Sequence, residues 1–374
     1  MCPEGSIEGR RSLLVASTLA VLAPSCISLV SAVAVASGNG AILQPIESKE
    51  SPAAAQISGK PSMPDLKRAI TSWKLRTKTL ELGLRTLVMG VVNITPDSFS
   101  DGGLFLDPAK AVARGLQLLE DGADFLDLGA ESTRPGSSAG PRAGDAAPAV
   151  SATEEQARLL PVLEGILQSR PDALISVDTY KAATAQAALA AGAEIVNDVS
   201  GLHWDSAMAG VCADAGCGVV LMHTRGRPDE WRAQQQLAPD ALMEMVRGGL
   251  VQSLAAADAA GIAREAIVLD PGYGFGKRFD ENFLLMARQH QLLDLERPLL
   301  AGVSRKSFLG HALASLHGGA TPATDQRDTA SLAAMVAVIL QGASIVRVHE
   351  VRQAVEAARI ADAVLAALCA QRPA

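Results

Sequence analysis

Polar side chains that can bind a ligand follow eight short apolar runs of the sequence. The runs cover residues 87–92, 125–128, 174–177, 195–196, 219–222, 267–269, 299–302 and 345–348. Close behind the first seven stand Asn93, Glu131 with Ser132, Thr133 and Arg134, Asp178, Asn197 with Asp198, His223, Asp270, and Ser304 with Arg305 and Lys306; Arg347 with His349 stands at the end of the last run. Carboxylates and amides can accept hydrogen bonds from a heterocycle, and cations can bind an anion. Loops of random composition would not place such bulky hydrogen-bonding types behind every run, so we predict one shared site.

Segments of helical periodicity separate the apolar runs. They cover residues 108–120, 154–168, 181–190, 242–260, 282–293 and 329–340. Strand–helix alternation of this kind builds a parallel sheet with right-handed crossovers, and eight units close naturally into a barrel. The runs are continuously apolar, as expected for strands covered on both faces. We therefore predict an α/β fold, a TIM (β/α)8 barrel over residues 65–374. The alternative is a doubly wound open sheet, which would place its chemistry at one switch point.

The first 64 residues differ in composition from the remainder. Arg10 and Arg11 precede a long uncharged stretch, and Ala-Val-Ala at residues 34–36 resembles a signal-peptide cleavage site. A proline and several serines interrupt the apolar part, which disfavours a stable membrane span. Residues 38–64 are rich in Gly, Ser, Pro and Ala, as linkers are. We interpret residues 1–64 as a signal-like or disordered low-complexity extension and expect a cytoplasmic protein. Export or membrane anchoring is the alternative if the segment acts as a signal.

The composition excludes several classes of protein. The 374 residues include 33 Lys and Arg against 40 Asp and Glu, so the formal charge is 33 − 40 = −7, which argues against a nucleic-acid binder. Hydrophobic residues make up 48% and charged residues 20%, a balance that supports a large core. Five cysteines without metal-ligand spacing indicate neither a disulfide framework nor a zinc site.

Five motifs, in order along the chain, carry a family resemblance. MGVVNITPDSFSDGG at residues 89–103, ESTRPG at 131–136, DPGYGFGK at 270–277, SRKS at 304–307 and RVH at 347–349 closely resemble the signatures of the dihydropteroate synthase family. The resemblance runs from about residue 70 to the C-terminus. It implies a pterin-binding barrel that condenses 6-hydroxymethyl-7,8-dihydropterin pyrophosphate with p-aminobenzoate. The products would be 7,8-dihydropteroate and pyrophosphate, in folate synthesis.

The chemistry of the residues agrees with a pterin pocket. A pterin presents an amidine-like donor edge, and each polar group buried without a partner would cost about 1–3 kcal/mol. The carboxylate of Asp270 can accept two parallel N–H bonds, Asp178 and Asn197 can complete the pattern, and Lys306 can donate to a ring acceptor. By resemblance these four residues match the family's pterin pocket, and Met222 and Phe275 match further substrate-binding positions.

A pyrophosphate needs positive charge on a protein whose net charge is negative. Arg134, Arg347 and His349 can supply charge-assisted hydrogen bonds to phosphate oxygens. Asn93 offers an oxygen suited to Mg²⁺ carried by the pyrophosphate, and by resemblance it is the metal position. Asn93 also begins a formal glycosylation sequon, but Pro96 follows it closely and it ends a strand, so we do not expect glycosylation.

The sequence contains no obvious nucleophile, and the implied reaction needs none. The amine of p-aminobenzoate attacks the methylene carbon directly, so the enzyme aligns two substrates and stabilises the departing pyrophosphate. By resemblance Thr133, Arg134 and Ser304 hold p-aminobenzoate, and Lys306, Arg347 and His349 form the catalytic set.

Two other functions remain open at the level of sequence. A folate-dependent methyltransferase domain shares the barrel and the acidic pocket, but it has no reason to combine Lys306 with Arg347 and His349. An exported barrel that binds a pterin or phosphate without catalysis is the other. The segment 137–150 is longer and richer in Ala, Gly and Pro than is usual in the family, which bears on loop closure. The resemblance also implies a homodimer that sulfonamides target, acting on small molecules without a nucleic-acid partner.

Overall fold

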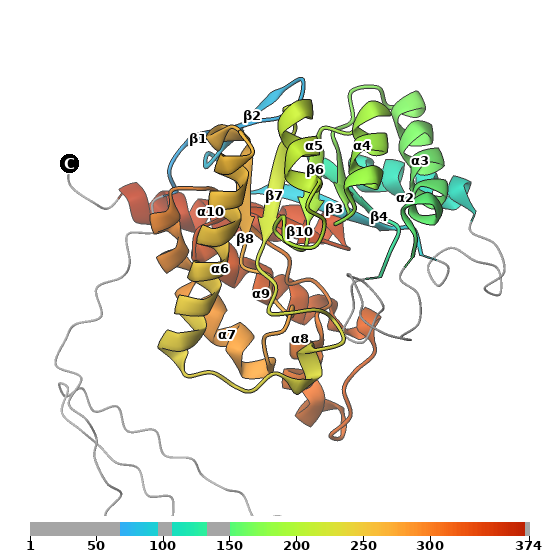
Figure 1. Ribbon diagram of the computed structural model, residues 1–374. Coiled ribbons are helices and arrows are strands. Elements are labelled where there is room, and N and C mark those ends of the chain that lie inside the picture. The colour runs from blue at the N-terminus through green and yellow to red at the C-terminus, as the bar shows by residue number, and fades with distance from the viewer. Residues whose placement is uncertain (1–67, 96–106, 133–149, 371–374) are drawn as a thin grey trace, which may run out of the picture. The chain divides into compact units, whose positions relative to one another are not determined.

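Eight parallel strands form a closed barrel. The computed structural model describes residues 68–95, 107–132 and 150–370 (Figure 1). The strands pair in the order β10-β3-β4-β5-β6-β7-β8-β9, so the sheet closes on itself. They are β3 (Leu87–Asn93), β4 (Phe125–Gly129), β5 (Ile175–Asp178), β6 (Ile195–Asp198), β7 (Gly218–Met222), β8 (Ile267–Asp270), β9 (Leu299–Ala301) and β10 (Ala343–Val348). This closure confirms the predicted TIM barrel and excludes the doubly wound open sheet.

Helices follow the strands along the chain and cover the outside of the barrel (Figure 1). The α-helices are α2 (Pro108–Glu120), α3 (Ala152–Ser169), α4 (Ala182–Ala190), α5 (Met208–Ala215), α6 (Pro239–Ala259), α7 (Phe279–Arg288), α8 (Ser307–Leu313), α9 (Asp328–Leu340) and α10 (Val351–Ala370). Short 3-10 helices are η1 (Trp231–Ala233), η2 (Arg264–Ala266), η3 (Gln289–Leu295), η4 (Ala314–His317) and η5 (Thr324–Arg327). The six predicted helices are present; the one expected over 282–293 becomes 3-10 in its second half.

Local sequence signals set the starts of the first two helices after the barrel begins. The side chain of Asp107 accepts a hydrogen bond from the Ala109 amide at 3.0 Å, and Pro108 occupies the first helical position, where its missing N–H costs nothing. Ser151 caps α3 in the same way, accepting from the Glu154 amide at 3.1 Å. These caps fix where the chain leaves the barrel rim and turns into the outer layer.

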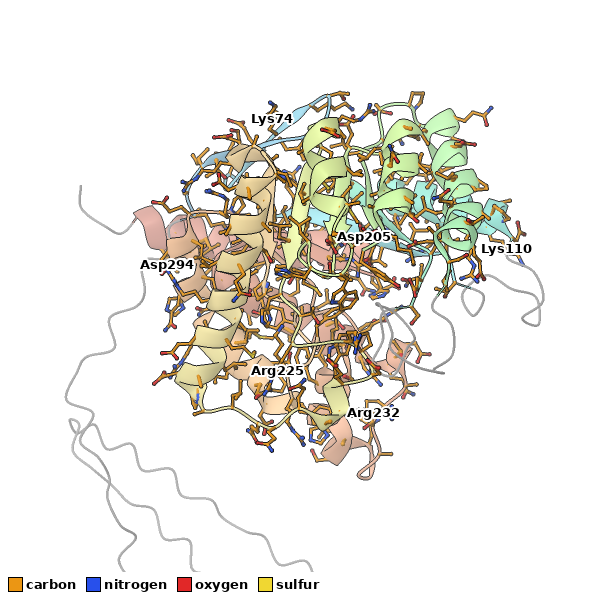
Figure 2. All side chains as sticks on the ribbon, viewed as in Figure 1. Lys74, Lys110, Asp205, Arg225, Arg232 and Asp294 are labelled. Carbon is orange, nitrogen blue, oxygen red and sulfur yellow. The ribbon has the colours of Figure 1, made fainter. Side chains whose placement is uncertain are left out.

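A two-stranded antiparallel hairpin, β1 (Thr71–Lys74) and β2 (Thr79–Leu82), closes the N-terminal end of the barrel. Trp73 is fully buried among the inward-facing side chains near the amino ends of the barrel strands. Its indole nitrogen donates to the Ala266 carbonyl at 2.8 Å. Leu75 packs so close to Gly218 that a β-carbon there would lie 2.6 Å from it. Figure 2 labels Lys74 on this hairpin and Arg225 at the opposite end of the barrel. The sequence interpretation did not anticipate the hairpin.

The parallel register brings the polar strand ends to one rim. Asp178 pairs with Asn197 across β5 and β6, and Met222 pairs with Asp270 across β7 and β8. Because every strand runs in the same direction, all carboxyl ends open on the same face of the barrel. Active sites of such barrels form on this face.

Part of the predicted chain lies outside the described residues. This applies to the N-terminal extension, to residues 96–103 of the first motif, to Thr133 and Arg134, and to all but the last residue of the segment 137–150. None of the helices in the described ranges has the length and apolar character needed to cross a membrane.

Candidate functional site

Arg347 lies near the carboxyl end of β10 and joins two carboxylates. Its Nε donates to Oδ2 of Asp127 at 2.6 Å, and its Nη2 donates to Oδ2 of Asp178 at 2.7 Å. The three side chains come from β10, β4 and β5. Strands β4 and β5 are adjacent and β3 separates β4 from β10, so the side chains meet because the barrel is closed. A guanidinium has five donors in one plane, so two contacts fix its orientation and leave donors to spare.

Asp178 sits at the end of β5 with its side chain 13% exposed. Burial, which disfavours the charged form, raises its pKa to about 7. The positive charge of Arg347 opposes that shift, and the negative charge of Asp127 adds to it. Asp178 therefore titrates close to neutrality.

Asp270 ends β8 and is built into a tight turn. Its Oδ1 accepts the backbone N–H of Gly272 at 2.7 Å, and burial raises its pKa. Gly272 has φ +70°, and a β-carbon there would stand 1.9 Å from the His223 carbonyl, so only glycine fits. Gly302 lies between Asp270 and Arg347; a β-carbon there would be 3.8 Å from Cβ of Arg347 and 4.0 Å from Oδ2 of Asp270. The turn thus occupies one oxygen of Asp270, and the other faces Gly302.

Lys306, in the loop after β9, lies close enough to Asp270, Arg347 and Asp178 for their charges to act on it. Its Nζ lies 4.0 Å from the centre of the Phe275 ring, a cation–π contact. Burial lowers its pKa to about 8, while the charge of Asp270 works against that shift. Phe275 is itself held edge-to-face against Trp231, with ring centroids 5.0 Å apart.

Hydrogen bonds hold the two residues that precede Lys306. Ser304 Oγ lies 3.0 Å from Nδ1 of His349 and accepts its backbone N–H at 3.3 Å. Arg305 adopts φ +59°, unusual for a residue with a side chain, and is held by Asp328 at 2.7 and 3.0 Å and by Glu350 at 2.8 Å. Strand β10 ends at Val348, so His349 lies just beyond the strand, beside Ser304.

Two residues of the site were not singled out in the sequence. Asp127 is a charged residue within an apolar run, and that contrast was the available signal, since a fully buried carboxylate must be paired. Lys277 is 6% exposed and donates to the carbonyls of His223 and Gly272, both at 2.8 Å. It ties together the loops that follow β7 and β8. Nothing local in the sequence indicated that a lysine would be buried there.

Some polar strand ends serve the fold. Both carboxylate oxygens of Asp198 accept backbone N–H groups, from Ser200 and Leu202, each at 2.8 Å. His223 packs against Gly249 of α6, where a β-carbon would lie 2.4 Å from the ring. Asn93, in contrast, is partly exposed at the end of β3. In the described ranges no cluster of three or more His, Cys, Asp or Glu side chains could hold a metal ion.

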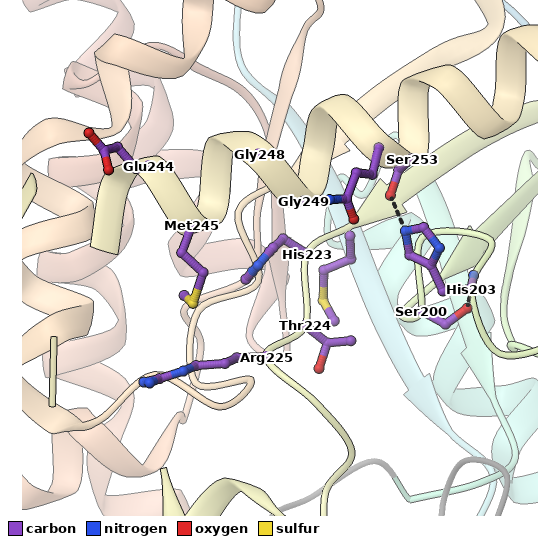
Figure 3. A pocket seen from close by; sticks show the side chains of 12 residues that line it. Ser200, His203, His223, Thr224, Arg225, Glu244, Met245, Gly248, Gly249 and Ser253 are labelled. Atoms are coloured by element: carbon purple, nitrogen blue, oxygen red, sulfur yellow. Dashed lines mark hydrogen bonds between the residues drawn. The ribbon is translucent and has the colours of Figure 1, made fainter. Parts of the chain in front are cut away.

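A cavity of about 400 Å³ opens beside the rim, between the loops after β6 and β7 and the helix α6 (Figure 3). Met222 and His223 line it on the barrel side, and Arg225 extends along another part of its wall. His203 Nε2 and Ser253 Oγ, 3.2 Å apart, form its far side. Of the predicted binding residues, the cavity includes Met222. The other predicted residues in the described ranges lie around Arg347, Asp270 and Lys306. Asn93 is the exception, because no contact of its side chain places it beside these three residues.

Known proteins are similar to this chain in sequence and fold. The model of the pterin binding enzyme family matches residues 89–349. Dihydropteroate synthase of Escherichia coli is 39% identical over 282 residues, covering 75% of this chain and 92% of that protein. The mitochondrial folate synthesis bifunctional protein of Pisum sativum is 37% identical over 298 residues; the match covers 76% of this chain and only 55% of that protein. The structure of Xanthomonas albilineans dihydropteroate synthase with 4-aminobenzoic acid superimposes with a TM-score of 0.69 at 38% identity, covering 80% of this chain and 99% of that one.

The family match spans the barrel from β3 to the end of the RVH motif, and the E. coli relative is matched over nearly its whole length. The barrel, the ordered motifs and the acidic and cationic rim are thus found together in one chain. This chain belongs to the dihydropteroate synthase family of pterin-binding enzymes.

Proposed function

We propose that this chain condenses 6-hydroxymethyl-7,8-dihydropterin pyrophosphate with p-aminobenzoate, as a transferase of folate biosynthesis. The observation that carries the proposal is the convergence of Asp178, Asp270, Lys306 and Arg347 on one end of the barrel. The two carboxylates can accept hydrogen bonds from a heterocycle, and the two cations can donate to an anion. One substrate that carries both groups could contact all four residues.

The pterin ring would bind between Asp270 and Arg347, beside Gly302. The unoccupied oxygen of Asp270 and the carboxylate of Asp178 accept the donor edge of the ring. Lys306, lying over Phe275, donates to a ring acceptor. Burial of these groups strengthens each hydrogen bond, because little water competes for them.

Arg347 and His349 would stabilise the pyrophosphate. Arg347 uses two donors on Asp127 and Asp178, and its remaining donors can reach phosphate oxygens. The developing negative charge of a leaving pyrophosphate is then met by a fixed cation. Thr133 and Arg134, outside the described residues, remain proposed contacts of p-aminobenzoate and pyrophosphate, and Ser304 is a proposed contact of p-aminobenzoate.

Asn93 is the proposed protein ligand of a magnesium ion. Magnesium is usually held by one or two protein oxygens together with substrate phosphates and water. The amide oxygen of Asn93 would be the protein ligand, and the ion would neutralise charge on the departing pyrophosphate. We expect Asn93→Ala to raise the Mg²⁺ concentration needed for half-maximal activity; an unchanged Mg²⁺ dependence would contradict this role.

In the reaction the amine nitrogen of p-aminobenzoate forms a bond to the methylene carbon. The carbon–oxygen bond to pyrophosphate breaks with its electron pair on oxygen, and the amine loses a proton. Electron release from the pterin ring favours a dissociative transition state. A carbon-13 isotope effect typical of a tight displacement would contradict that last point.

One assay separates the proposal from its alternatives. The purified protein is incubated with both substrates and Mg²⁺, and both pyrophosphate and dihydropteroate are measured. A methyltransferase domain or a non-catalytic pterin-binding barrel releases no pyrophosphate. Omitting p-aminobenzoate is the control, because simple hydrolysis of the pterin substrate would release pyrophosphate without dihydropteroate.

The homodimer, sulfonamide sensitivity and cytoplasmic location are further parts of the proposal. Phe279 and Phe283, 41% and 37% exposed, lie one turn apart on α7, and Phe279 stacks on His311 of α8 with centroids 4.0 Å apart. This apolar face suits a second copy of the chain. Sedimentation of wild type and of Phe283→Asp tests the dimer.

Competition of a sulfonamide with p-aminobenzoate tests the drug site. Fractionation of cells that express the full chain tests the location.

A further inference from the structure

Asp127 occupies an unusual place for a charged residue. It lies in the middle of β4, and its side chain is 0% exposed. Phe125, two residues earlier, belongs to the core inside the barrel, while Leu126 and Leu128 pack against the outer helices. Since side chains alternate along a strand, Asp127 points into the barrel one level above Phe125. Burying a carboxylate there costs several kcal/mol unless it is well paired.

One oxygen of Asp127 holds two side chains of the rim. Oδ2 accepts from Nε of Arg347 at 2.6 Å and from Nδ2 of Asn197 at 3.0 Å. An ionised carboxylate only accepts, so the amide nitrogen of Asn197 must face it and the amide oxygen must face away. A single group buried below the rim therefore sets the orientation of residues on β6 and β10.

We propose that Asp127 is a positioning residue, which fixes the Arg347 guanidinium and the Asn197 carboxamide in the orientation that meets the substrates. This inference rests on the proposed function. Asp127 itself lies beneath both side chains and touches neither substrate.

The geometry explains why a mere counter-ion would not suffice. Asp127 holds Nε and Asp178 holds Nη2, so two carboxylates on adjacent strands define the plane of the guanidinium. Without Asp127, Arg347 could rotate about its remaining contact with Asp178. Displacements of about 1 Å at a reacting centre can cost about 100-fold in rate.

Asp127 also acts on the charge of its neighbour. The groups that face Asp178 are Arg347 on β10, Asp127 on β4, Glu155 on α3 and Lys306 after β9. After burial, the negative charge of Asp127 is the largest influence that raises the pKa of Asp178. Its removal should lower that pKa and move the acidic limb of pterin binding to lower pH.

The test compares three variants of the full chain. Asp127→Asn keeps the size and removes the charge, and Asp127→Glu keeps the charge and displaces the carboxylate. Glu194→Gln is the matched control, because Glu194 is also a buried carboxylate, 5% exposed, but pairs with Thr77 at the hairpin end of the barrel. Turnover, pterin binding by calorimetry and thermal unfolding are measured against pH.

Positioning predicts a specific combination of results. Asp127→Glu, which displaces the carboxylate from both side chains, should lower kcat/KM by about 10- to 100-fold, within the range seen when orientation is lost, with the acidic limb near its wild-type position. Asp127→Asn, whose amide oxygen can still accept from Arg347 and Asn197, should lose less turnover and shift the acidic limb to lower pH. Glu194→Gln should lower only the melting temperature.

Two results would overturn the inference. Wild-type kcat/KM in Asp127→Glu would show that Arg347 and Asn197 need no orientation. A loss of activity in proportion to the unfolded fraction, with an unmoved pH limb, would show a purely structural role. An inactive wild-type enzyme would instead refute the proposed function, so the two failures are distinguishable.

Discussion

The substitution Asp270→Asn has a defined geometric consequence. Oδ1 of Asp270 accepts the Gly272 N–H at 2.7 Å, and Lys277 holds this turn by donating to the Gly272 carbonyl at 2.8 Å. The single oxygen of an Asn at 270 should therefore stay on the backbone N–H. Its NH2 group then replaces the other oxygen, so a donor meets the donor edge of the pterin.

The magnitude follows from two losses. A hydrogen bond to a charged acceptor contributes about 1.5–3 kcal/mol, and a buried donor without a partner costs about 1–3 kcal/mol. Asp270 is 6% exposed, so water cannot readily satisfy the displaced donor. The sum lies near 3–4 kcal/mol after some relaxation, which corresponds to an affinity for the pterin lower by about 100- to 1,000-fold.

Calorimetric titration with the free pterin measures this affinity, since no chemistry is involved. Asp294→Asn is the control, because Asp294 forms a half-exposed ion pair with Arg247 and should leave binding unchanged. Thermal unfolding verifies that the Asp270 variant is folded. Pterin affinity within about twofold of wild type, less than 0.5 kcal/mol, would refute the assignment of the free oxygen of Asp270 as an acceptor.

Three further predictions concern the cation, the pH dependence and the hairpin. Arg347→Ala should lower kcat by about 100-fold or more, as loss of a preorganised donor does, but lower free-pterin affinity less than Asp270→Asn; equal pterin affinities would contradict this division of roles. The pH profile of kcat/KM should be bell-shaped. Asp178, with a pKa raised to about 7, must be ionised to accept a hydrogen bond, and Lys306, with a pKa lowered to about 8, must be protonated to donate one. A flat profile across that pH window would exclude both roles. Trp73→Ala should lower the free energy of unfolding by about 3–5 kcal/mol without changing kcat per folded molecule. Denaturant titration measures the first quantity and an activity assay the second. An unchanged denaturation midpoint would show that the hairpin does not stabilise the barrel.

The sequence predicted the fold because its signals are local. Continuous apolar runs and helical periodicity are properties of short segments, and eight repeats of one unit leave few topologies. The strand ends fell within a residue or two of the predicted positions, since polar residues such as Asp178 and Asp270 terminate the apolar runs. The hairpin was missed because it is short and its only strong signal, Trp73, is meaningful once the barrel exists to bury it.

The sequence alone determined which chemical groups the rim would offer: acceptors for a ring, donors for an anion and no nucleophile. The tertiary structure decided how those groups are used. Asp127 contacts Asn197, 70 residues further along the chain, and Arg347, 220 residues further along. Only barrel closure with a fixed strand register brings the three together. Burial at that meeting point then moves the pKa values of Asp178 and Lys306 toward neutrality. Desolvation depends on everything packed around a group, so no stretch of sequence encodes it by itself.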